Sequence, residues 1–258
     1  MKRGYIDLPE SQVHYLRGGA GDNLLLLHQT GQSSDEYARM IPALVKKFHV
    51  IAMDTPGYGK SDRPAVKFTH EDYARTVIAF LKALGISRVS IIGHLTGASL
   101  AVEVAATSPT LVEKLVLIDL PFYSLEMRKS RQENAHFQGQ AVKPDGSHIT
   151  ELWKLFSNLT PGARVETLNS AVINAMLAGD QLHAGHQALF RYELEKRLPL
   201  VKCPSLLISG SEAPLHQRID AVLELKPRWP LIKMTGGGDM LPLERPDECN
   251  RAILEFLK

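Results

Sequence analysis

The sequence predicts an α/β fold with a mostly parallel, doubly wound sheet, helices on both of its faces and an inserted helical lid. Short apolar segments alternate with segments of helical periodicity, which favours parallel strands joined by right-handed crossovers. Several of these short segments are apolar throughout, as expected for strands that are covered on both faces. With 258 residues, of which 44% are hydrophobic, the chain is long enough for one large domain with a sizeable core.

The elements begin with a predicted hairpin over Tyr5 to Leu16, which turns at residues 9–11, where Pro, Glu and Ser follow one another. The next segment, Asn23 to Leu27, reads as a fully buried strand that ends at His28. Val50 to Met53 repeats that pattern and stops at a loop rich in Gly and Pro. Further strands are predicted at Val89–Ile92, Lys114–Ile118, Ser205–Ser209 and Leu231–Met234, and helices at Glu71–Leu84, Thr96–Ala106 and Pro246–Leu257.

The alternation of strand and helix stops between Pro121 and about Leu200. This stretch reads as several amphipathic helices broken at residues 143–146 and 160–162, where Pro and Gly occur together. The sequence therefore predicts a core domain of residues 1–120 and 201–258 and a helical cap of residues 121–200. Since the cap follows one strand and returns to another, we expect it over the carboxyl ends of the strands, where open α/β sheets bind ligands.

Composition favours a small-molecule ligand or substrate and leaves the oligomeric state open. The net charge of +2 comes from 30 basic and 28 acidic residues spread along the chain, so neither nucleic acid nor a membrane is expected as a partner. Cys203 and Cys249 form no CxxC pair, and no His cluster has metal-ligand spacing, so no metal and no cofactor are expected. The N-terminal residues lack the apolar core of a signal peptide, which indicates a cytoplasmic location.

The most informative motif is Gly93-His94-Leu95-Thr96-Gly97, which has the outline of a nucleophile elbow. In a G-x-S-x-G turn the glycines allow a strand and a helix to approach closely, while the strained central residue presents a hydroxyl. Here both glycines are present, but Leu95 stands at the centre. An aliphatic side chain cannot attack a carbonyl carbon.

With three further motifs, the chain resembles the α/β-hydrolase superfamily over essentially its whole length. His28-Gln29-Thr30-Gly31 is similar to the family's histidine–glycine oxyanion loop. The segment from Asp54 to Ser61 matches its D-x-P-G-x-G-x-S turn, and residues 236–246 resemble the loop that carries the catalytic histidine. The ordered spacing of all four motifs is far more specific than any one of them.

The same resemblance implies that all three catalytic positions are altered. Leu95 occupies the nucleophile position, Ala213 stands where the acid loop carries its aspartate, and Asp239 stands where the histidine belongs. Triad chemistry needs a nucleophile, a base and an acid that orients the base. Hydrolysis through a catalytic serine is therefore not expected.

The backbone part of such a site does not depend on these side chains. The resemblance assigns the oxyanion donors to the N–H groups of Thr30 and Thr96, neither of which is a proline. Asp239 reads either as a proton carrier, with a pKa raised by burial, or as a turn residue that bonds local backbone after three glycines.

Four more residues are candidates for lining or supporting a binding site. His28 is expected to brace the oxyanion loop beside Gln29, and His94 to pack beneath the elbow. Asp119 is either a displaced acid or a strand-end cap. In the cap, three residues at helical spacing read first as a packed amphipathic face, and the alternative is that one of them lines the pocket: His183, His186 and Phe190.

Two functions from different classes remain open. The first is an enzyme that acts on a small, mostly apolar carbonyl compound by a non-serine mechanism, through lyase- or decarboxylase-like chemistry or water-mediated hydrolysis, with Asp239 as the proton carrier. The second is a catalytically inactive protein in which the same pocket binds a small-molecule ligand. An Asp239 that lies away from the pocket above Leu95 would remove the proton carrier and favour the second.

Overall fold

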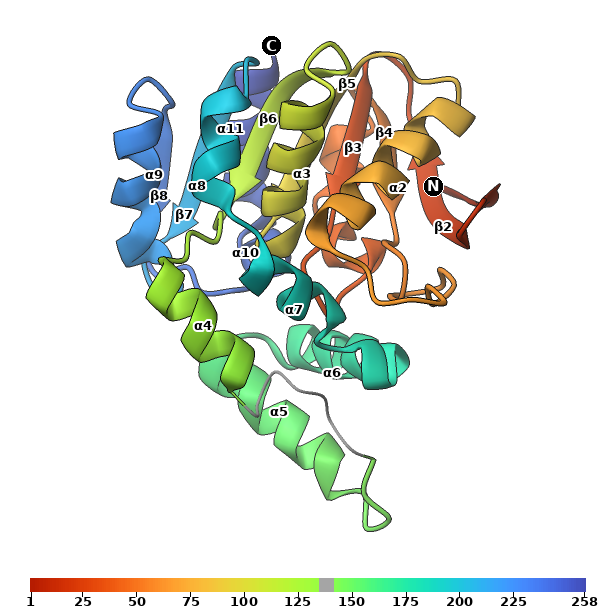
Figure 1. Cartoon of the computed structure of the whole chain (residues 1–258), viewed down its shortest axis with the longest axis vertical. Helices are drawn as coiled ribbons and strands as arrows, with labels where there is room; N and C mark the ends of the chain where they lie inside the picture. Colours follow the sequence, from red (N-terminus) through yellow and green to blue (C-terminus); the bar gives the residue numbers. More distant parts are fainter. Residues whose placement is uncertain (135–141) are drawn as a thin grey trace.

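A computed structural model of the chain, which describes residues 1–134 and 142–258, contains one eight-stranded sheet with the order β1-β2-β4-β3-β5-β6-β7-β8 (Figure 1). β1 and β2 form the expected hairpin, β2 pairs antiparallel with β4, and every pairing from β4 across to β8 is parallel. The strands are β1 (Lys2–Leu8), β2 (Ser11–Gly18), β3 (Asn23–Leu27), β4 (His49–Met53), β5 (Val89–His94), β6 (Val112–Ile118), β7 (Ser205–Gly210) and β8 (Leu231–Met234).

The chain changes direction across the sheet at β3. After β3 it forms β4 on one side, and it then crosses back to form β5 on the other side. Ligands of open α/β sheets bind where the strand order reverses in this way, because the loops leaving the two strands diverge there. The loops that follow β3 and β5 begin with His28 and Leu95, so the topology brings the oxyanion loop and the elbow together.

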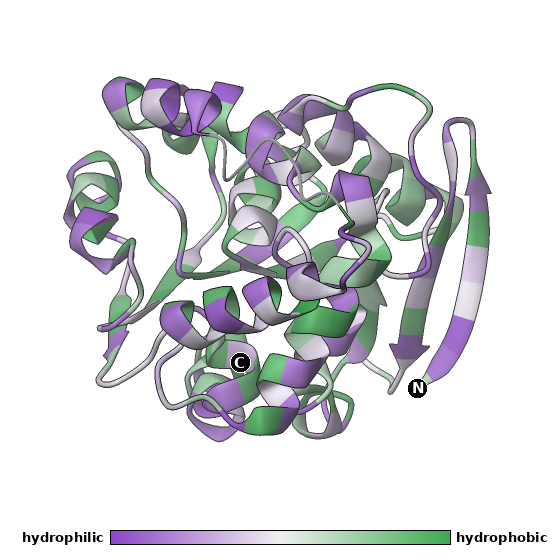
Figure 2. Cartoon of the chain, turned by 90° about the horizontal axis from the view of Figure 1, so that it is seen from below, coloured by the Kyte–Doolittle hydropathy of each residue, from purple (hydrophilic) through white to green (hydrophobic). Residues whose placement is uncertain are grey.

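Helices cover both faces of the sheet, and the strand side chains alternate between two hydrophobic clusters. Along β3, Leu25 and Leu27 pack with residues of α2, α3 and α9, whereas Leu24 and Leu26 pack with residues of α1, α10 and α11. Viewed from below, several of the helices carry one hydrophobic and one hydrophilic side (Figure 2). The helices are α1 (Ile41–Leu44), α2 (His70–Ala83), α3 (Thr96–Thr107), α9 (Ile219–Leu225), α10 (Leu241–Glu244) and α11 (Pro246–Leu257).

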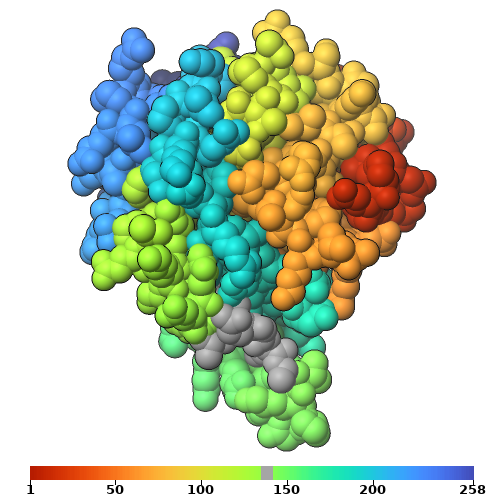
Figure 3. Space-filling model, viewed as in Figure 1, coloured from red at the N-terminus to blue at the C-terminus, as the bar shows by residue number. Residues whose placement is uncertain are grey.

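Between β6 and β7 the described chain is helical. α4 to α7 lie beyond the carboxyl ends of the strands, whereas α8 packs against α3, and α5 projects furthest from the sheet (Figures 1 and 3). Breaks fall at residues 143–146 and 160–162 as expected, while residues 135–141 of the predicted cap lie outside the described part. The elements are α4 (Leu125–Glu133), α5 (Ser147–Leu159), α6 (Val165–Ala178), η3 (Gly179–Gln181), α7 (Ala184–Arg191), α8 (Leu194–Arg197) and η4 (Leu198–Leu200).

The predicted fold class is confirmed, and the predicted elements differ from the observed ones by only a few residues. α2 begins at His70 because Thr69 and Asp72 form a capping box, in which the Thr69 side chain accepts from the Asp72 N–H group. The short helices α1, α9 and α10 were not predicted, because four to seven residues carry too little periodicity to be distinguished from a loop. Among the described helices, none has the length and apolar character required to cross a bilayer.

Candidate active site

The turn after β5 keeps the backbone of a nucleophile elbow although its central side chain is leucine. Leu95 has φ 47° and ψ −114°, and among the described non-glycine residues only Asp119 shares its positive φ. A Cβ atom on Gly93 would lie 2.3 Å from the Gly97 carbonyl oxygen, and one on Gly97 would lie 2.0 Å from that of Leu27. Both glycines are therefore required by close packing, which holds the central residue in its strained conformation.

A cavity of about 370 Å³ lies above the elbow. Leu95, Thr96 and Asp239 line it from the core, and helices between β6 and β7 supply the opposite wall. This volume falls within the range of small-molecule sites, and most of its lining is apolar. The cavity residues from those helices include Arg131, Leu155, Phe156, Leu159, Leu182, His183, His186, Leu189 and Phe190.

Asp239 faces this cavity from the loop after β8 and is half-buried. Burial raises the pKa of Asp239 to about 7, and the negative charge of Asp119 acts in the same direction, while His94 and Arg131 oppose the rise. A carboxyl group with this pKa changes its protonation state at neutral pH. Such a group can accept a proton from a ligand and return it without a large driving force in either direction.

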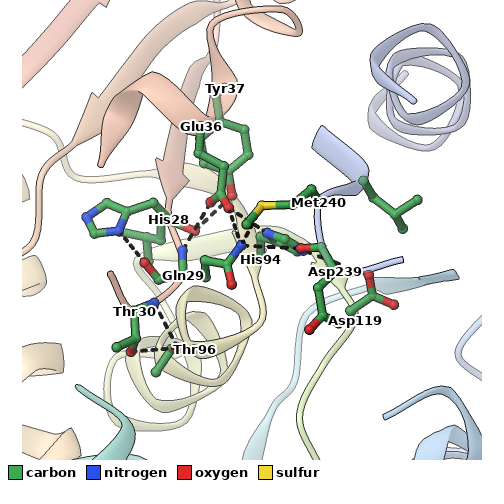
Figure 4. A network of polar contacts seen from close by, with 12 residues as sticks. His28, Gln29, Thr30, Glu36, Tyr37, His94, Thr96, Asp119, Asp239 and Met240 are labelled. Carbon is green, nitrogen blue, oxygen red and sulfur yellow. Dashed lines mark hydrogen bonds and ion pairs between the residues drawn. The ribbon is translucent and has the colours of Figure 1, made fainter. Parts of the chain in front are cut away.

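His94, which precedes Leu95, belongs to a buried group of charges with Glu36 and Asp119 (Figure 4). His94 is fully buried, with its Nδ1 atom 2.9 Å from Glu36 Oε1 and its Nε2 atom 3.8 Å from Asp119 Oδ2. Burial alone would lower the pKa of His94, but Glu36 and Asp119 raise it to about 10. Although burial acts to raise it, the pKa of Glu36 is lowered by His94 and by the Gln29 side chain. We therefore describe His94 as an imidazolium between two carboxylates.

The two expected oxyanion donors differ in their present bonding. Thr30 donates its N–H group to Thr96 Oγ1 at 3.0 Å, and Thr96 Oγ1 donates in turn to Thr30 Oγ1 at 2.8 Å. Thr96 is the first residue of α3, so its own N–H group has no acceptor within the helix. The Thr30 N–H group is therefore bonded to the Thr96 hydroxyl in this structure, whereas the Thr96 N–H group has no acceptor within α3.

Of the remaining candidate site residues, some support the loops around the cavity and others line the cavity itself. His28 lies under the loop, accepting from the Thr55 N–H group at Nε2 and bonding the Gln29 carbonyl through Nδ1, while the Gln29 side chain reaches the cavity. Asp119 is buried and accepts from the Gly210 N–H group. Ala213 is buried in the loop after β7. Of the four binding candidates, only Gln29 borders the cavity above Leu95; His28, His94 and Asp119 do not.

Two features of the site were missed from the sequence. Glu36 was not singled out as a site residue, but its carboxylate is buried and accepts from the Gln29 N–H and side-chain amide groups. Arg131 was not singled out at all. Its contribution depends on how the helices between β6 and β7 pack, and no local pattern carries that information. Within residues 1–134 and 142–258, no three His, Cys, Asp or Glu side chains are grouped to hold a metal ion.

Restoring a hydroxyl at the elbow is not expected to restore esterase activity. In Leu95→Ser the new side chain has the elbow backbone, but the position of the family's catalytic histidine is Asp239, and the ring nitrogens of the adjacent His94 both face carboxylates. Assays of purified Leu95→Ser with activated esters should give rates no higher than the wild-type protein. A strong gain, abolished by a serine-directed phosphonate, would show that a base has been overlooked.

Removing the charge of Asp119 is expected to lower the pKa of Asp239. Asp119 follows burial as the second cause of the raised value, and asparagine keeps the shape of the side chain without its charge. A ¹³C NMR titration of the aspartate carboxyl groups, with Asp239 assigned by comparison with Asp239→Asn, measures the shift. An unchanged titration of Asp239 in Asp119→Asn would contradict the coupling.

Comparison with known proteins adds an independent line of evidence. Residues 22–146 match the family model described as alpha/beta hydrolase fold. The chain is 32% identical to a 2-hydroxy-6-oxo-6-(2'-aminophenyl)hexa-2,4-dienoic acid hydrolase from Metapseudomonas resinovorans, over 95% of this chain and 87% of the relative. It is 38% identical to a soluble epoxide hydrolase from Corynebacterium sp. (strain C12), but this match covers only 42% of the chain and 38% of that relative.

Solved structures agree with the fold. An enol-lactonase from Burkholderia xenovorans LB400 superposes with a TM-score of 0.84 over 98% of this chain and 99% of the other, at 20% identity. At that level of identity the likeness concerns the arrangement of the backbone and not the reaction.

Proposed function

Because the chain belongs to the alpha/beta hydrolase fold family, we propose that it acts on a small, mostly apolar carbonyl compound without a serine nucleophile, using Asp239 as its proton carrier. The observation that carries the proposal is the position of Asp239, which lines the same cavity as Leu95 and Thr96 and whose carboxyl group has a pKa raised to about 7 by burial and Asp119.

The reaction begins with a carbonyl oxygen near the N terminus of α3. The Thr96 N–H group donates to this oxygen, and a rotation of the Thr96 side chain about Cα–Cβ releases the Thr30 N–H group as a second donor. The Asp239 carboxylate then takes a proton from the substrate or from a bound water. When the proton comes from the substrate, the electron pair of the broken C–H bond forms an enolate, which takes the proton back from Asp239 at the end of the reaction. When the proton comes from water, the hydroxide bonds to the carbonyl carbon, and the oxyanion that results collapses with cleavage of the bond to the leaving group, which takes the proton from Asp239.

The helices of residues 121–200 act in this proposal as a lid that excludes water. Their apolar side chains form much of the cavity wall, and a low-polarity cavity strengthens both the donation from Thr96 and the rise in the pKa of Asp239. Both cysteines are free, which is compatible with the cytoplasmic location expected from the sequence.

A second candidate function is a catalytically inactive protein that binds a small molecule in the same cavity. The bonding of the Thr30 N–H group to Thr96 Oγ1 favours it, because Thr30 and Thr96 do not present two free N–H groups as a preformed pair of oxyanion donors. Under this alternative the degenerate triad has been replaced by an apolar floor at Leu95, and Asp239 only contributes polarity.

Incubation of the wild-type protein with a panel of esters, lactones and β-keto acids distinguishes the two. The enzyme proposal predicts turnover of at least one compound with no serine acyl-enzyme detectable by mass spectrometry. Saturable binding by members of the panel without any turnover would instead support the binding protein.

A further inference from the structure

Thr30 and Thr96 border two cavities at once. Both residues line the cavity of about 370 Å³ above Leu95, and both also line a second cavity of about 20 Å³. The smaller cavity has about the space that one water molecule needs. Its wall also contains five residues whose side chains carry a hydroxyl or an imidazole group: His28, Thr55, Tyr58, His70 and Tyr73. The two threonines therefore lie between the ligand cavity and a small space with polar groups in its wall.

One hydroxyl group holds this pair together through two hydrogen bonds. Thr96 Oγ1 accepts from the Thr30 N–H group at 3.0 Å and donates to Thr30 Oγ1 at 2.8 Å (Figure 4). Both residues are buried, so bulk water competes little for these bonds. The acceptor of the Thr30 N–H group in this structure is thus a neutral hydroxyl oxygen of the protein itself.

The Thr30 side chain is confined by the helix α7. A Cβ atom on Gly185 would lie 2.4 Å from Thr30 Oγ1, so the backbone of α7 closely approaches this hydroxyl. The Gly185 N–H group donates to Tyr58 Oη at 2.8 Å, and Tyr58 Oη donates to the Gln181 carbonyl at 3.1 Å, which fixes this approach. Release of the Thr30 N–H group therefore depends on Thr96. Threonine in a helix adopts two χ1 rotamers, and the smaller cavity offers space beside the Thr96 side chain.

Replacing the Thr96 hydroxyl by a ligand exchanges one acceptor for another. A neutral carbonyl oxygen accepts a hydrogen bond of similar strength, so the exchange gains little, and the rotation of Thr96 remains as a cost. An oxygen with negative charge accepts bonds roughly twice as strong, which outweighs that cost. The Thr96 N–H group has no acceptor within α3 and requires no such exchange.

We propose that the Thr96 hydroxyl competes with the ligand for the Thr30 N–H group, so that this donor is engaged only by an oxygen that carries negative charge. A neutral carbonyl oxygen then accepts from the Thr96 N–H group alone, whereas an enolate or a tetrahedral oxyanion accepts from both. The additional bond forms as charge develops, and such an interaction lowers a reaction barrier without tightening the binding of the substrate. The inference rests on the proposed function in one respect, the placement of the ligand oxygen at the N terminus of α3.

Two probes with the same aromatic ring test this without requiring turnover. 4-Nitrophenolate ends in a charged oxygen, and 4-nitrobenzaldehyde ends in a neutral carbonyl oxygen. Binding is measured at about pH 8 in Asp239→Asn, because the Asp239 carboxylate would repel the phenolate. In ¹H–¹⁵N correlation spectra the Thr30 amide proton should shift downfield with the phenolate and keep its position with the aldehyde. The Thr96 amide proton should respond to both probes.

A valine substitution removes the competing hydroxyl and keeps the shape and the N–H group of residue 96. When Thr96→Val is added to Asp239→Asn, the Thr30 amide proton should respond to the aldehyde as well. Isothermal titration calorimetry should show about threefold to tenfold tighter binding of the phenolate, since one neutral hydrogen bond no longer has to be broken. The control is Thr107→Val, the same substitution at the exposed last residue of α3, which should leave the affinity for both probes unchanged.

Because every protein in this comparison lacks the Asp239 carboxylate, the result does not depend on the assigned proton carrier. A Thr30 response limited to the phenolate, and extended to the aldehyde by Thr96→Val, supports the inference even if no compound is turned over. An equal Thr30 response to both probes before Thr96→Val is added, an unchanged affinity for the phenolate after it, an equal gain in Thr107→Val, or no saturable binding of the phenolate at millimolar concentration would overturn it. Turnover by the wild-type protein that depends on Asp239 would leave the proposed function standing in each of these cases.

Discussion

Asp239→Asn is expected to reduce kcat/KM by about 10²–10⁴-fold for any substrate that the panel identifies, the usual contribution of a positioned acid or base. Asparagine keeps the size of the side chain and its place in the cavity but cannot exchange a proton. In the wild-type protein kcat/KM should rise as pH increases through about 7, because the carboxylate form takes the first proton and burial with Asp119 raises the pKa of Asp239 to about 7. Steady-state kinetics over this range measure both effects.

The control for this experiment is Asp220→Asn, an exposed carboxylate on α9 that should leave turnover unchanged. Stability provides a second control. Since the pKa of Asp239 is higher in the folded chain than its ordinary 3.8, stability falls as pH rises from about 4 to about 7, and Asp239→Asn lacks this loss. The variant should therefore melt at the same or a higher temperature than the wild-type protein at pH 8. Unchanged turnover in a well-folded Asp239→Asn would remove the assigned role.

His94→Leu is expected to destabilise the fold by about 3–5 kcal/mol, the usual cost of removing one partner from a buried ion pair. The substitution leaves Glu36 and Asp119 as buried carboxylates without the cation between them. Urea denaturation followed by circular dichroism measures the loss. The control is His49→Leu, at a half-buried histidine whose side chain, among the described contacts, is bonded only to the neutral Asn23 side chain, and it should cost about 1 kcal/mol or less.

The stability difference between the wild-type protein and His94→Leu is expected to depend on pH. Despite its burial, the pKa of His94 is raised by Glu36 and Asp119 from an ordinary 6.5 to about 10, so its contribution is complete below about 6.5 and is lost as pH rises through about 10. The pKa of Glu36 is lowered from 4.5, so its contribution is lost as pH falls below that value. The difference between wild type and His94→Leu should be largest between about pH 4.5 and 6.5. A difference that grows toward pH 10 would contradict the charged state of His94.

The order of strands and helices could be predicted because it depends on local patterns that recur along the chain. The all-leucine part of β3 indicates a strand covered on both faces, and its alternate side chains do pack into two separate clusters. Gly93 and Gly97 could be recognised from spacing alone, since the close approach they allow is a property of the backbone. Helices such as α1 and α9 could not, because their few residues are fixed by packing against the sheet.

The sequence predicted only those parts of the candidate site whose position is set by the backbone of a recognisable motif. The place of Asp239 in the loop after β8 follows from the motif, and Asp239 is among the residues that line the cavity above Leu95. The bonding of Thr30 to Thr96, the burial of Glu36 and the position of Arg131 depend on side-chain rotamers and on contacts between residues far apart in the chain. No local sequence pattern predicts any of these three features.

The central claim is that the site has kept its backbone and moved its proton chemistry to Asp239. A ¹³C NMR titration of the Asp239 side-chain carboxyl group in the free protein tests it most directly, because it requires no substrate. We predict an apparent pKa of about 7, raised by burial and by Asp119. A titration near the ordinary value of 3.8 would show a solvated turn carboxylate and would contradict the claim.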